Sequence, residues 1–243
     1  MVVIFKISKK VLVGGSILLL FMALFFSYRQ VNAQAVPPPI ERVDTEEKVI
    51  ALTVNVDWGE EYIPKMLDVF DQYNAKVTFF VTGRWAKLNP ELLKEMAARG
   101  HQIENHGYSH PHPDQLSVQA NIEELRKTET VIYEITGHKT SFYAPPYGER
   151  VPSGLKAAAQ LRYRTVLWTL DTIDWRPEST PDVIAQRILN PAPRHGEAVD
   201  KRGAIVLMHP KESTVQALPV ILQSLTEQGF KAVSISQLIT LAE

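Results

Sequence analysis

LTVNVDWG, residues 52–59, begins with the pattern of a β-strand and ends in polar side chains. Thr53, Asn55 and Asp57 alternate with two valines, and side chains two residues apart in a strand lie on the same face of a sheet. If the strand stays regular, it therefore ends with an amide, Asn55, and a carboxylate, Asp57, on one face. A bulge at this point would turn Asp57 away.

Short apolar segments alternate with helical patterns from Val49 to the C-terminus. The expected strands are 49–56, 77–81, 102–104, 141–143, 165–168, 204–208 and 231–233. The expected helices are 62–73, a helix with Pro90 at its first position, 117–135, 153–160, 180–188, 215–228 and a last helix at the C-terminus. About seven β/α units predict an α/β fold built as a distorted (β/α) barrel, with an open doubly wound sheet as the alternative. In either fold the site is expected at the C-terminal ends of the strands.

The composition narrows the classes of function. The chain has 243 residues and a formal net charge of -1, which gives no electrostatic argument for nucleic-acid binding. It has no cysteine, so a metal would have to be held by His, Asp or Glu. We expect a monomer.

The first residues differ in kind from the rest. Lys6, Lys9 and Lys10 precede residues 11–28, which carry no charge and are just long enough to span a bilayer. We expect residues 1–33 to be a signal peptide or an N-terminal membrane anchor, and the protein to be secreted or anchored to the outer face of the cell membrane. Residues 34–47 are expected to be a Pro-rich linker, and residues 48–243 the folded domain.

Histidines gather in ENHGYSHPHPD, residues 104–114, directly after an expected strand. His106 and His110 are four residues apart, so both imidazoles can reach one metal ion if the segment turns helically. Two histidines and a carboxylate suit Zn²⁺ or another borderline divalent ion. The alternative is a solvated polar loop.

Three later segments also run from the end of an expected strand into the loop after it: FYAPPYGE (142–149), LWTLDTIDW (167–175) and AIVLMHP (204–210). The prolines stiffen the first segment, and a rigid turn can direct a backbone N–H at a developing oxyanion. His209 ends an apolar strand, where a lone histidine is more often structural. With an acid such as Asp174 beside it, His209 would be a tuned general acid.

Taken in this order, the five segments resemble the polysaccharide deacetylase family, carbohydrate esterase family 4, over about residues 48–243. The resemblance implies a distorted (β/α) barrel. It also implies hydrolysis of the N-acetyl groups of peptidoglycan or chitin-like polysaccharide. The implied cofactor is a divalent metal, Zn²⁺ first, with Co²⁺ or Ni²⁺ as alternatives.

The resemblance also implies roles for individual residues. His106 and His110 match the metal ligands, His209 matches the acid that protonates the leaving amine, and Asp174 matches the acid that tunes it. Four further positions match the substrate-binding wall, the acetyl pocket and the oxyanion turn: Trp175, Leu207, Pro146 and Tyr147.

The sequence departs from the family pattern T-F-D-D-G at its first motif. Asn55 stands at the position of the catalytic base and Val56 at that of the metal-binding Asp, while Ala144 replaces the arginine that pairs with the base. Loss of a general base typically costs about 10²–10⁴ in rate, although a zinc ion itself lowers the pKa of water to about 7. Asp57 is the candidate replacement as metal ligand or base. The insertion before Gly59 resembles the sporulation-associated branch of the family.

Three functions follow from this pattern. The first is a slow N-deacetylase of cell-wall glycan, based on the histidine pair with His209 and Asp174. The second is a catalytically inactive pseudoenzyme that binds cell-wall glycan, based on the joint change at Asn55 and Ala144. The third is a solute-binding domain that holds no metal.

Overall fold

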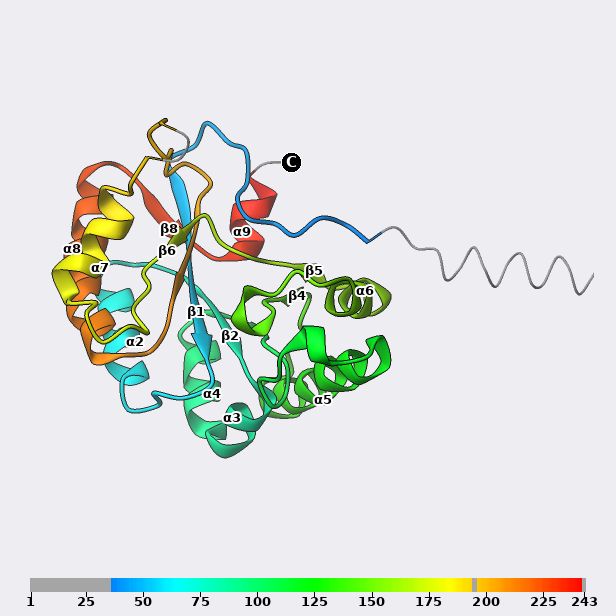
Figure 1. Cartoon of the computed structure of the whole chain (residues 1–243). Coiled ribbons are helices and arrows are strands. Elements are labelled where there is room, and N and C mark those ends of the chain that lie inside the picture. The colour runs from blue at the N-terminus through cyan, green and yellow to red at the C-terminus, as the bar shows by residue number, and fades with distance from the viewer. Residues whose placement is uncertain (1–35, 194–195, 242–243) are drawn as a thin grey trace, which may run out of the picture. The chain divides into compact units, whose positions relative to one another are not determined.

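A parallel sheet of eight strands runs through the part of the chain that the computed structural model describes, residues 36–193 and 196–241 (Figure 1). The strand order is β5-β4-β3-β2-β1-β7-β6, and β8 pairs with β1. The strands are β1 (Val49–Val56), β2 (Thr78–Val81), β3 (Gln102–Asn105), β4 (Phe142–Tyr143), β5 (Arg164–Thr165), β6 (Leu170–Asp171), β7 (Ile205–Met208) and β8 (Lys231–Val233). The fold is therefore α/β with a curled sheet, as the sequence predicts.

The central strand, β1, pairs with three neighbours. Thr53 to Val56 pair with β2, Ala51 to Val54 with β7, and Val49 to Ala51 with β8. All eight residues of β1 are buried, as expected for a parallel strand that is covered on both faces.

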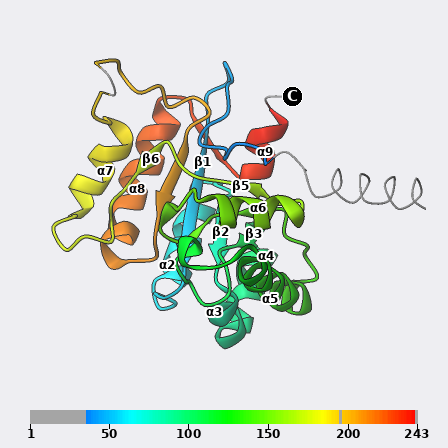
Figure 2. The ribbon, with the colours of Figure 1, turned by 45° about the vertical axis from the view of Figure 1, so that its right-hand side comes forward.

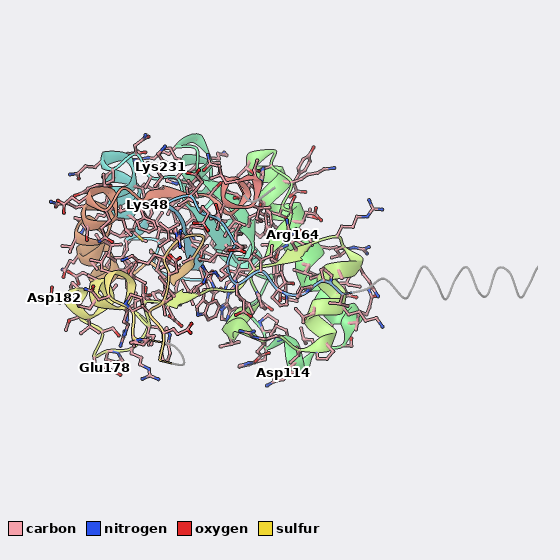
Figure 3. All side chains as sticks on the ribbon, turned by 90° about the horizontal axis from the view of Figure 1, so that it is seen from above. Lys48, Asp114, Arg164, Glu178, Asp182 and Lys231 are labelled. Carbon is pink, nitrogen blue, oxygen red and sulfur yellow. The ribbon has the colours of Figure 1, made fainter. Side chains whose placement is uncertain are left out.

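Helices follow most of the strands and cover the sheet (Figures 1 and 2). α7 packs against α8 and α8 against α2, while α5 contacts α3, α4 and α6. Their bounds are α2 (Ile63–Gln72), α3 (Gly83–Leu88), α4 (Pro90–Ala98), α5 (Val118–Thr136), α6 (Pro152–Gln160), α7 (Pro181–Leu189), α8 (Glu212–Glu227) and α9 (Ile235–Thr240). Exposed charged side chains lie at the periphery, and Figure 3 labels six of them: Lys48, Asp114, Arg164, Glu178, Asp182 and Lys231.

The two faces of β1 belong to different parts of the core. Ile50, Leu52 and Val54 pack into the larger apolar cluster, which includes the buried side chains of α2, α4, α7 and α8. Ala51 packs into a second cluster with residues of β7 and α9. The alternation places Thr53 and Asn55 on the face of Ala51, inside the curl of the sheet.

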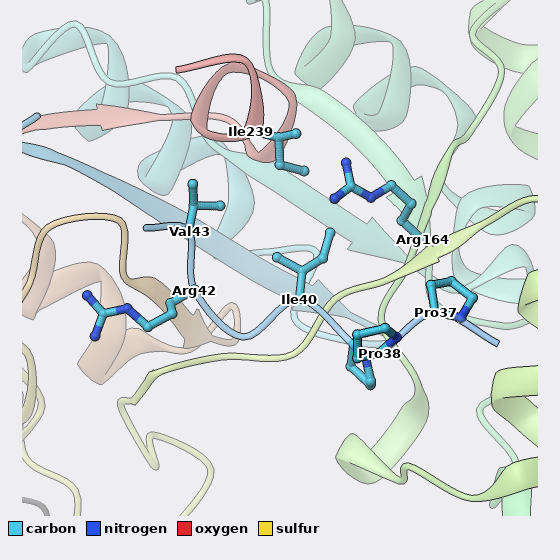
Figure 4. Close-up of a pocket in the computed structure, with 8 residues that line it drawn as sticks. Pro37, Pro38, Ile40, Arg42, Val43, Arg164 and Ile239 are labelled. Atoms are coloured by element: carbon cyan, nitrogen blue, oxygen red, sulfur yellow. The ribbon is translucent and has the colours of Figure 1, made fainter. Parts of the chain in front are cut away.

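The sheet ends at β5 and β6, and the chain before β1 crosses between these two strands. Ile40 N–H donates to Thr165 O (2.8 Å), and Leu167 N–H donates to Ile40 O (2.8 Å). Figure 4 shows this segment where it lies beside Arg164 and Ile239. The part of the predicted linker from Ile40 onward is therefore bound to the domain rather than free.

Several elements differ locally from the sequence prediction. In place of the strand expected at 165–168, the structure has β5 at Arg164–Thr165, because Leu167 N–H bonds to Ile40 instead of continuing the β4–β5 ladder, and the short strand β6 was not expected. The unpredicted helix α3 is capped by the Thr82 hydroxyl, which accepts from Trp85 N–H. Helix α8 begins before the predicted Val215, at Glu212, and holds Pro219 inside.

The predicted signal peptide or N-terminal membrane anchor, residues 1–33, lies outside the described residues. Among the residues that the structure does describe, no helix combines the length and apolar character needed to cross a membrane.

A side chain replaces part of the ladder between β3 and β4, which share one residue pair, Asn105 with Tyr143. The buried Glu104 carboxylate accepts from Ser141 N–H and Phe142 N–H, both at 2.8 Å. Charge-assisted bonds of this kind are stronger than neutral ones.

We expect Glu104→Ala to lower the free energy of unfolding by about 3 kcal/mol, because the buried Phe142 amide and the partly buried Ser141 amide lose a charged acceptor. Urea denaturation followed by tryptophan fluorescence measures this change. Glu91→Ala is the control, since Glu91 is exposed and forms a surface pair with Lys94, and it should cost less than about 0.5 kcal/mol. Equal losses in the two variants would contradict the role assigned to Glu104.

Candidate active site

A groove lies at the C-terminal ends of β1, β3, β4, β6 and β7. Eight of the predicted site residues line it: Asn55, Asp57, His106, His110, Tyr147, Trp175, Leu207 and His209. Pro146 and Asp174 do not line the groove, but each is buried next to a residue that does. The parallel sheet thus brings together residues up to 154 positions apart in the sequence, Asn55 and His209.

One side of the groove carries a histidine held by a buried carboxylate. The His209 ring nitrogen Nδ1 lies 2.8 Å from Asp174 Oδ1, and His209 N–H donates to Asp174 Oδ2 at 2.7 Å. The Thr214 hydroxyl donates to Oδ2 as well, at 2.7 Å. Burial alone would raise the pKa of Asp174, but these bonds outweigh it and keep the pKa below its usual 3.8. Asp174 is therefore an anion that fixes the His209 ring.

The loop after β1 packs against the same histidine. The Trp58 ring is stacked on the His209 ring, with centroids 6.1 Å apart and an interplanar angle of 10°. Gly59 has φ of 82°, and a Cβ at this position would lie 2.2 Å from Pro210 O. The glycine is required both by its backbone conformation and by this close approach.

His106 is oriented by the backbone of the PPYG turn. Its ring nitrogen Nδ1 lies 2.7 Å from Ala144 O, so Nδ1–H donates to the carbonyl. This bond leaves Nε2 as the lone-pair nitrogen, which is the usual arrangement of a metal-binding histidine. Burial lowers the pKa of His106 to about 3, so the imidazole is neutral near pH 7.

His110 approaches His106 through a loop, not through the helical turn that the four-residue spacing suggests. The two ring centroids are 5.0 Å apart, and His110 has φ of 57°. The Glu124 carboxylate of α5 holds the loop by accepting from Tyr108 N–H (2.9 Å) and Ser109 N–H (2.7 Å). Burial also lowers the pKa of His110. The structure thus presents two neutral imidazoles side by side.

Asp57 is bound to a cation of the protein itself. Its Oδ1 accepts from Thr82 Oγ1 at 2.7 Å and from Arg84 Nε at 2.8 Å, and its Oδ2 accepts from an Arg84 terminal nitrogen. Burial would raise the pKa of Asp57, but the bonds from Arg84 and Thr82 outweigh it and lower the pKa below 3.8. Both carboxylate oxygens of this candidate ligand therefore already accept hydrogen bonds from the protein.

Asn55 contributes a polar atom that has no partner within the described protein. The residue is only 6% exposed, and its Oδ1 is buried without a hydrogen-bond donor. Because buried polar atoms normally find a partner, Oδ1 is suited to accept a bond from a bound molecule or to face a cation. His106 and His110 line the same groove, so the three side chains offer neutral donors of the kind that a divalent ion takes, with the Arg84-paired Asp57 beside them.

The PPYG turn is braced by aromatic contacts. Tyr147 has φ of 59° and lies between two rings: it stacks on His112 at 3.7 Å and contacts His110 edge-on at 4.8 Å. The His112 ring is held by Glu149 at 2.7 Å. Gly148 has φ of 67°, and a Cβ there would lie 2.4 Å from the Trp168 ring.

Another set of possible metal ligands lies beside this turn. Within the described residues, three His, Asp or Glu side chains have ligand atoms all within 4.8 Å of one another only at His112, Asp114 and Glu149. His112 and Glu149 already bond to each other there, and Glu149 also accepts from Asp114 N–H. Asp57, His106 and His110 line one groove, but their ligand atoms do not all lie within 4.8 Å of one another.

Sequence reasoning missed Arg84 altogether and left Trp168 and Asp171 without a role. Arg84 lies on the short helix α3, whose only sequence signal was the Thr82-Gly83 pair after β2. Asp171 faces the groove, and burial raises its pKa. The aromatic residue Trp168 was visible in the LWTLDTIDW segment, but only the structure places its ring against Gly148.

Comparisons with known proteins show the family to which this chain is similar. Residues 42–166 match the family model for polysaccharide deacetylase. The chain is 34% identical over 203 residues to the uncharacterized protein YlxY of Bacillus subtilis, which covers 84% of this chain but only 61% of YlxY. It is 32% identical over 216 residues to a peptidoglycan-N-acetylglucosamine deacetylase of Bacillus cereus, with 86% of this chain and 73% of the relative covered.

Solved structures give the same likeness. The crystal structure of BA3943, a CE4 family pseudoenzyme from Bacillus anthracis, matches with a TM-score of 0.78 and 37% identity over 84% of this chain and 70% of that one. A BA3943 mutant with restored enzymatic activity matches with the same TM-score and 36% identity, over 84% and 72% of the two chains.

We expect Asp174→Asn to destabilise the protein at neutral pH by about 2–4 kcal/mol, because a buried, charge-assisted network loses its anion. The lowered pKa of Asp174 means that its contribution is complete above 3.8 and is lost as the pH falls through the folded-state pKa, which lies below 3.8. Urea midpoints of both proteins between pH 7 and pH 3 check this. The difference should shrink only in the most acidic samples, while the exposed Asp182→Asn control should show no comparable difference. A gap that stays constant with pH would contradict the assignment.

Proposed function

The chain belongs to the polysaccharide deacetylase family, and we propose that it acts on N-acetylated cell-wall polysaccharide, peptidoglycan or a chitin-like polymer, as a slow, metal-dependent N-deacetylase. The observation that carries this proposal is the pairing of His209 with Asp174 in the same groove as His106 and His110. We further propose that the protein is exported, and that it is either secreted or attached to the membrane through residues 1–33.

The acid half of the site supports hydrolysis directly. Amide hydrolysis adds water to the acetyl carbonyl carbon, breaks the C–N bond and needs a proton on the departing amine. Asp174 holds Nδ1 of His209, so Nε2 is the ring nitrogen left to deliver that proton. Leu207 and Trp175 line the same groove, where an acetyl group and a sugar ring can pack.

The histidine pair supports metal dependence. A divalent ion held by His106 and His110 would polarise the acetyl carbonyl, and we take it to be Zn²⁺, with Co²⁺ or Ni²⁺ as alternatives. The Ala144 carbonyl fixes the His106 ring for this role, and Glu124 fixes the loop that carries His110. The Tyr147 backbone N–H, on its rigid turn, is proposed to face the oxyanion that forms on the substrate.

The base half of the site accounts for the proposed low rate. The Asn55 amide cannot accept a proton at neutral pH, and Asp57 is neutralised by Arg84. Ala144 is buried at the position of the family arginine, which agrees with the absence of a carboxylate at position 55, because a buried arginine without a partner would be costly.

The same observations favour a second candidate, a pseudoenzyme that binds cell-wall glycan without hydrolysing it. Asn55 offers a buried acceptor for a sugar N–H or O–H, and Trp58, Tyr147 and Trp175 are exposed aromatic residues beside the groove. The likeness to the BA3943 pseudoenzyme adds to this candidate.

We expect Asn55→Asp to raise the rate of acetate release by about 10²–10⁴, because a carboxylate then stands where water must lose a proton. The full-length chain in detergent is assayed on N-acetylglucosamine oligomers and on peptidoglycan, with Zn²⁺, Co²⁺ or Ni²⁺ added. His209→Ala should abolish release in both backgrounds.

The outcome separates the two candidates. Metal-dependent release by the wild type that is lost in His209→Ala supports the slow enzyme. Release by Asn55→Asp alone, with binding of the wild type to insoluble peptidoglycan, supports the glycan-binding protein. A wild type that neither releases acetate nor binds acetylated glycan would contradict both.

A further inference from the structure

Arg84 is placed at the site by its backbone as well as by its side chain. It is the second residue of α3, and Arg84 N–H donates to Tyr108 O at 3.0 Å, in the loop between the two histidines. Gly83 N–H donates to Gly107 O at 3.0 Å, and a Cβ on Gly83 would lie 2.4 Å from the Tyr108 ring. The start of α3 is thus tied to the histidine loop.

The guanidinium of Arg84 donates to both oxygens of Asp57, in the bidentate (two-pronged) geometry that arginine forms with carboxylates. The Thr82 hydroxyl adds a third bond to Oδ1 and fixes the carboxylate against the start of α3. The Asp57 side chain is only 11% exposed, whereas that of Arg84 is 49% exposed. The anion is therefore enclosed in the groove, and the cation covers it from the solvent side.

A metal ion and a guanidinium compete for the same oxygens. Asp57 lines one groove with His106 and His110, and it is the one acidic side chain of the first motif that can serve as their third ligand. Because both of its oxygens already accept bonds from Arg84 or Thr82, a metal ion has to displace Arg84, share the carboxylate with it, or bind without Asp57. The positive charge of Arg84 also remains beside any ion bound there.

We propose that Arg84 is a built-in counter-ion that withholds Asp57 from the metal and sets a low divalent-cation affinity at the His106–His110 pair. This inference rests on the proposed metal site. In this role Arg84 acts against metal binding, because the protein supplies its own cation to the Asp57 carboxylate that would otherwise neutralise a bound metal ion.

Zinc binding to the full-length chain in detergent, measured by isothermal titration, tests this role. We expect Arg84→Gln to bind Zn²⁺ about 10- to 100-fold more tightly than the wild type, a change of the size that groups around metal ligands produce. The gain should disappear in Arg84→Gln/Asp57→Asn, and His106→Ala should abolish the tight site. Arg202→Gln is the matched control, because Arg202 grips Asp200 in a similar way away from the groove, and it should leave the affinity unchanged.

Arg84→Lys is a second variant whose zinc affinity tests the same role, whether or not Arg84→Gln folds well. Lysine keeps the charge but not the two-pronged contact, so it should give a smaller gain. If the affinity for Zn²⁺ rises in neither variant, or if the gain persists when Asp57→Asn is added, the role of Arg84 is overturned while a His106-dependent zinc site remains. Zinc binding that is absent, or that persists after His106→Ala, would instead remove the metal site on which the proposed function rests.

Discussion

Backbone pairing along β1 is the constraint on which the rest of the structure depends. One strand of eight residues holds β2, β7 and β8, and it is buried along its whole length. Its alternation sends one row of side chains under the helices and the other into the curl of the sheet. Because all the strands run parallel, their C-terminal ends meet at one edge, and the residues that follow them share one groove.

The electrostatics of that groove are uneven. On the β6–β7 side, a buried carboxylate with three hydrogen bonds fixes the ring of His209. On the β1 side, an amide replaces the expected carboxylate, and the next acid, Asp57, is matched by Arg84. The two histidines between these sides are held neutral by burial. The site therefore retains the His209–Asp174 pair, to which the proposed function assigns proton delivery, while it lacks a free carboxylate on β1.

Local pattern was sufficient for most of the fold. Alternation in β1, Pro90 at the start of α4 and Gly137 after α5 mark their elements because each signal acts within a few residues. The groove residues followed from motifs placed after strands. What sequence could not supply was pairing at a distance. Nothing near Asp57 points to Arg84, which lies 27 positions away, on a helix too short to have a periodic signal.

The same limit explains the other differences. The contact between Ile40 and Leu167 joins segments far apart in the sequence, so a strand judged by composition alone was drawn too long. The approach of His110 to His106 depends on a positive φ and on Glu124 of α5, neither of which a four-residue spacing encodes.

The strands that bound the groove differ in length, and this affects how its walls move. β4 and β5 have two residues each, and β4 is joined to β3 by one residue pair, one further backbone bond and the carboxylate of Glu104, whereas β1 and β7 pair over four residues deep in the core. Few backbone bonds need to open to release β4 and β5, so we expect amide protons there to exchange through small local openings and those of β1 only through global unfolding. The turn that carries Tyr147 is braced internally, but it sits on the wall that is joined to the sheet by fewer backbone bonds, whereas His209 sits on the other wall. We expect a polymer bound as proposed to displace the β4–β5 wall as a unit more readily than the β1–β7 wall.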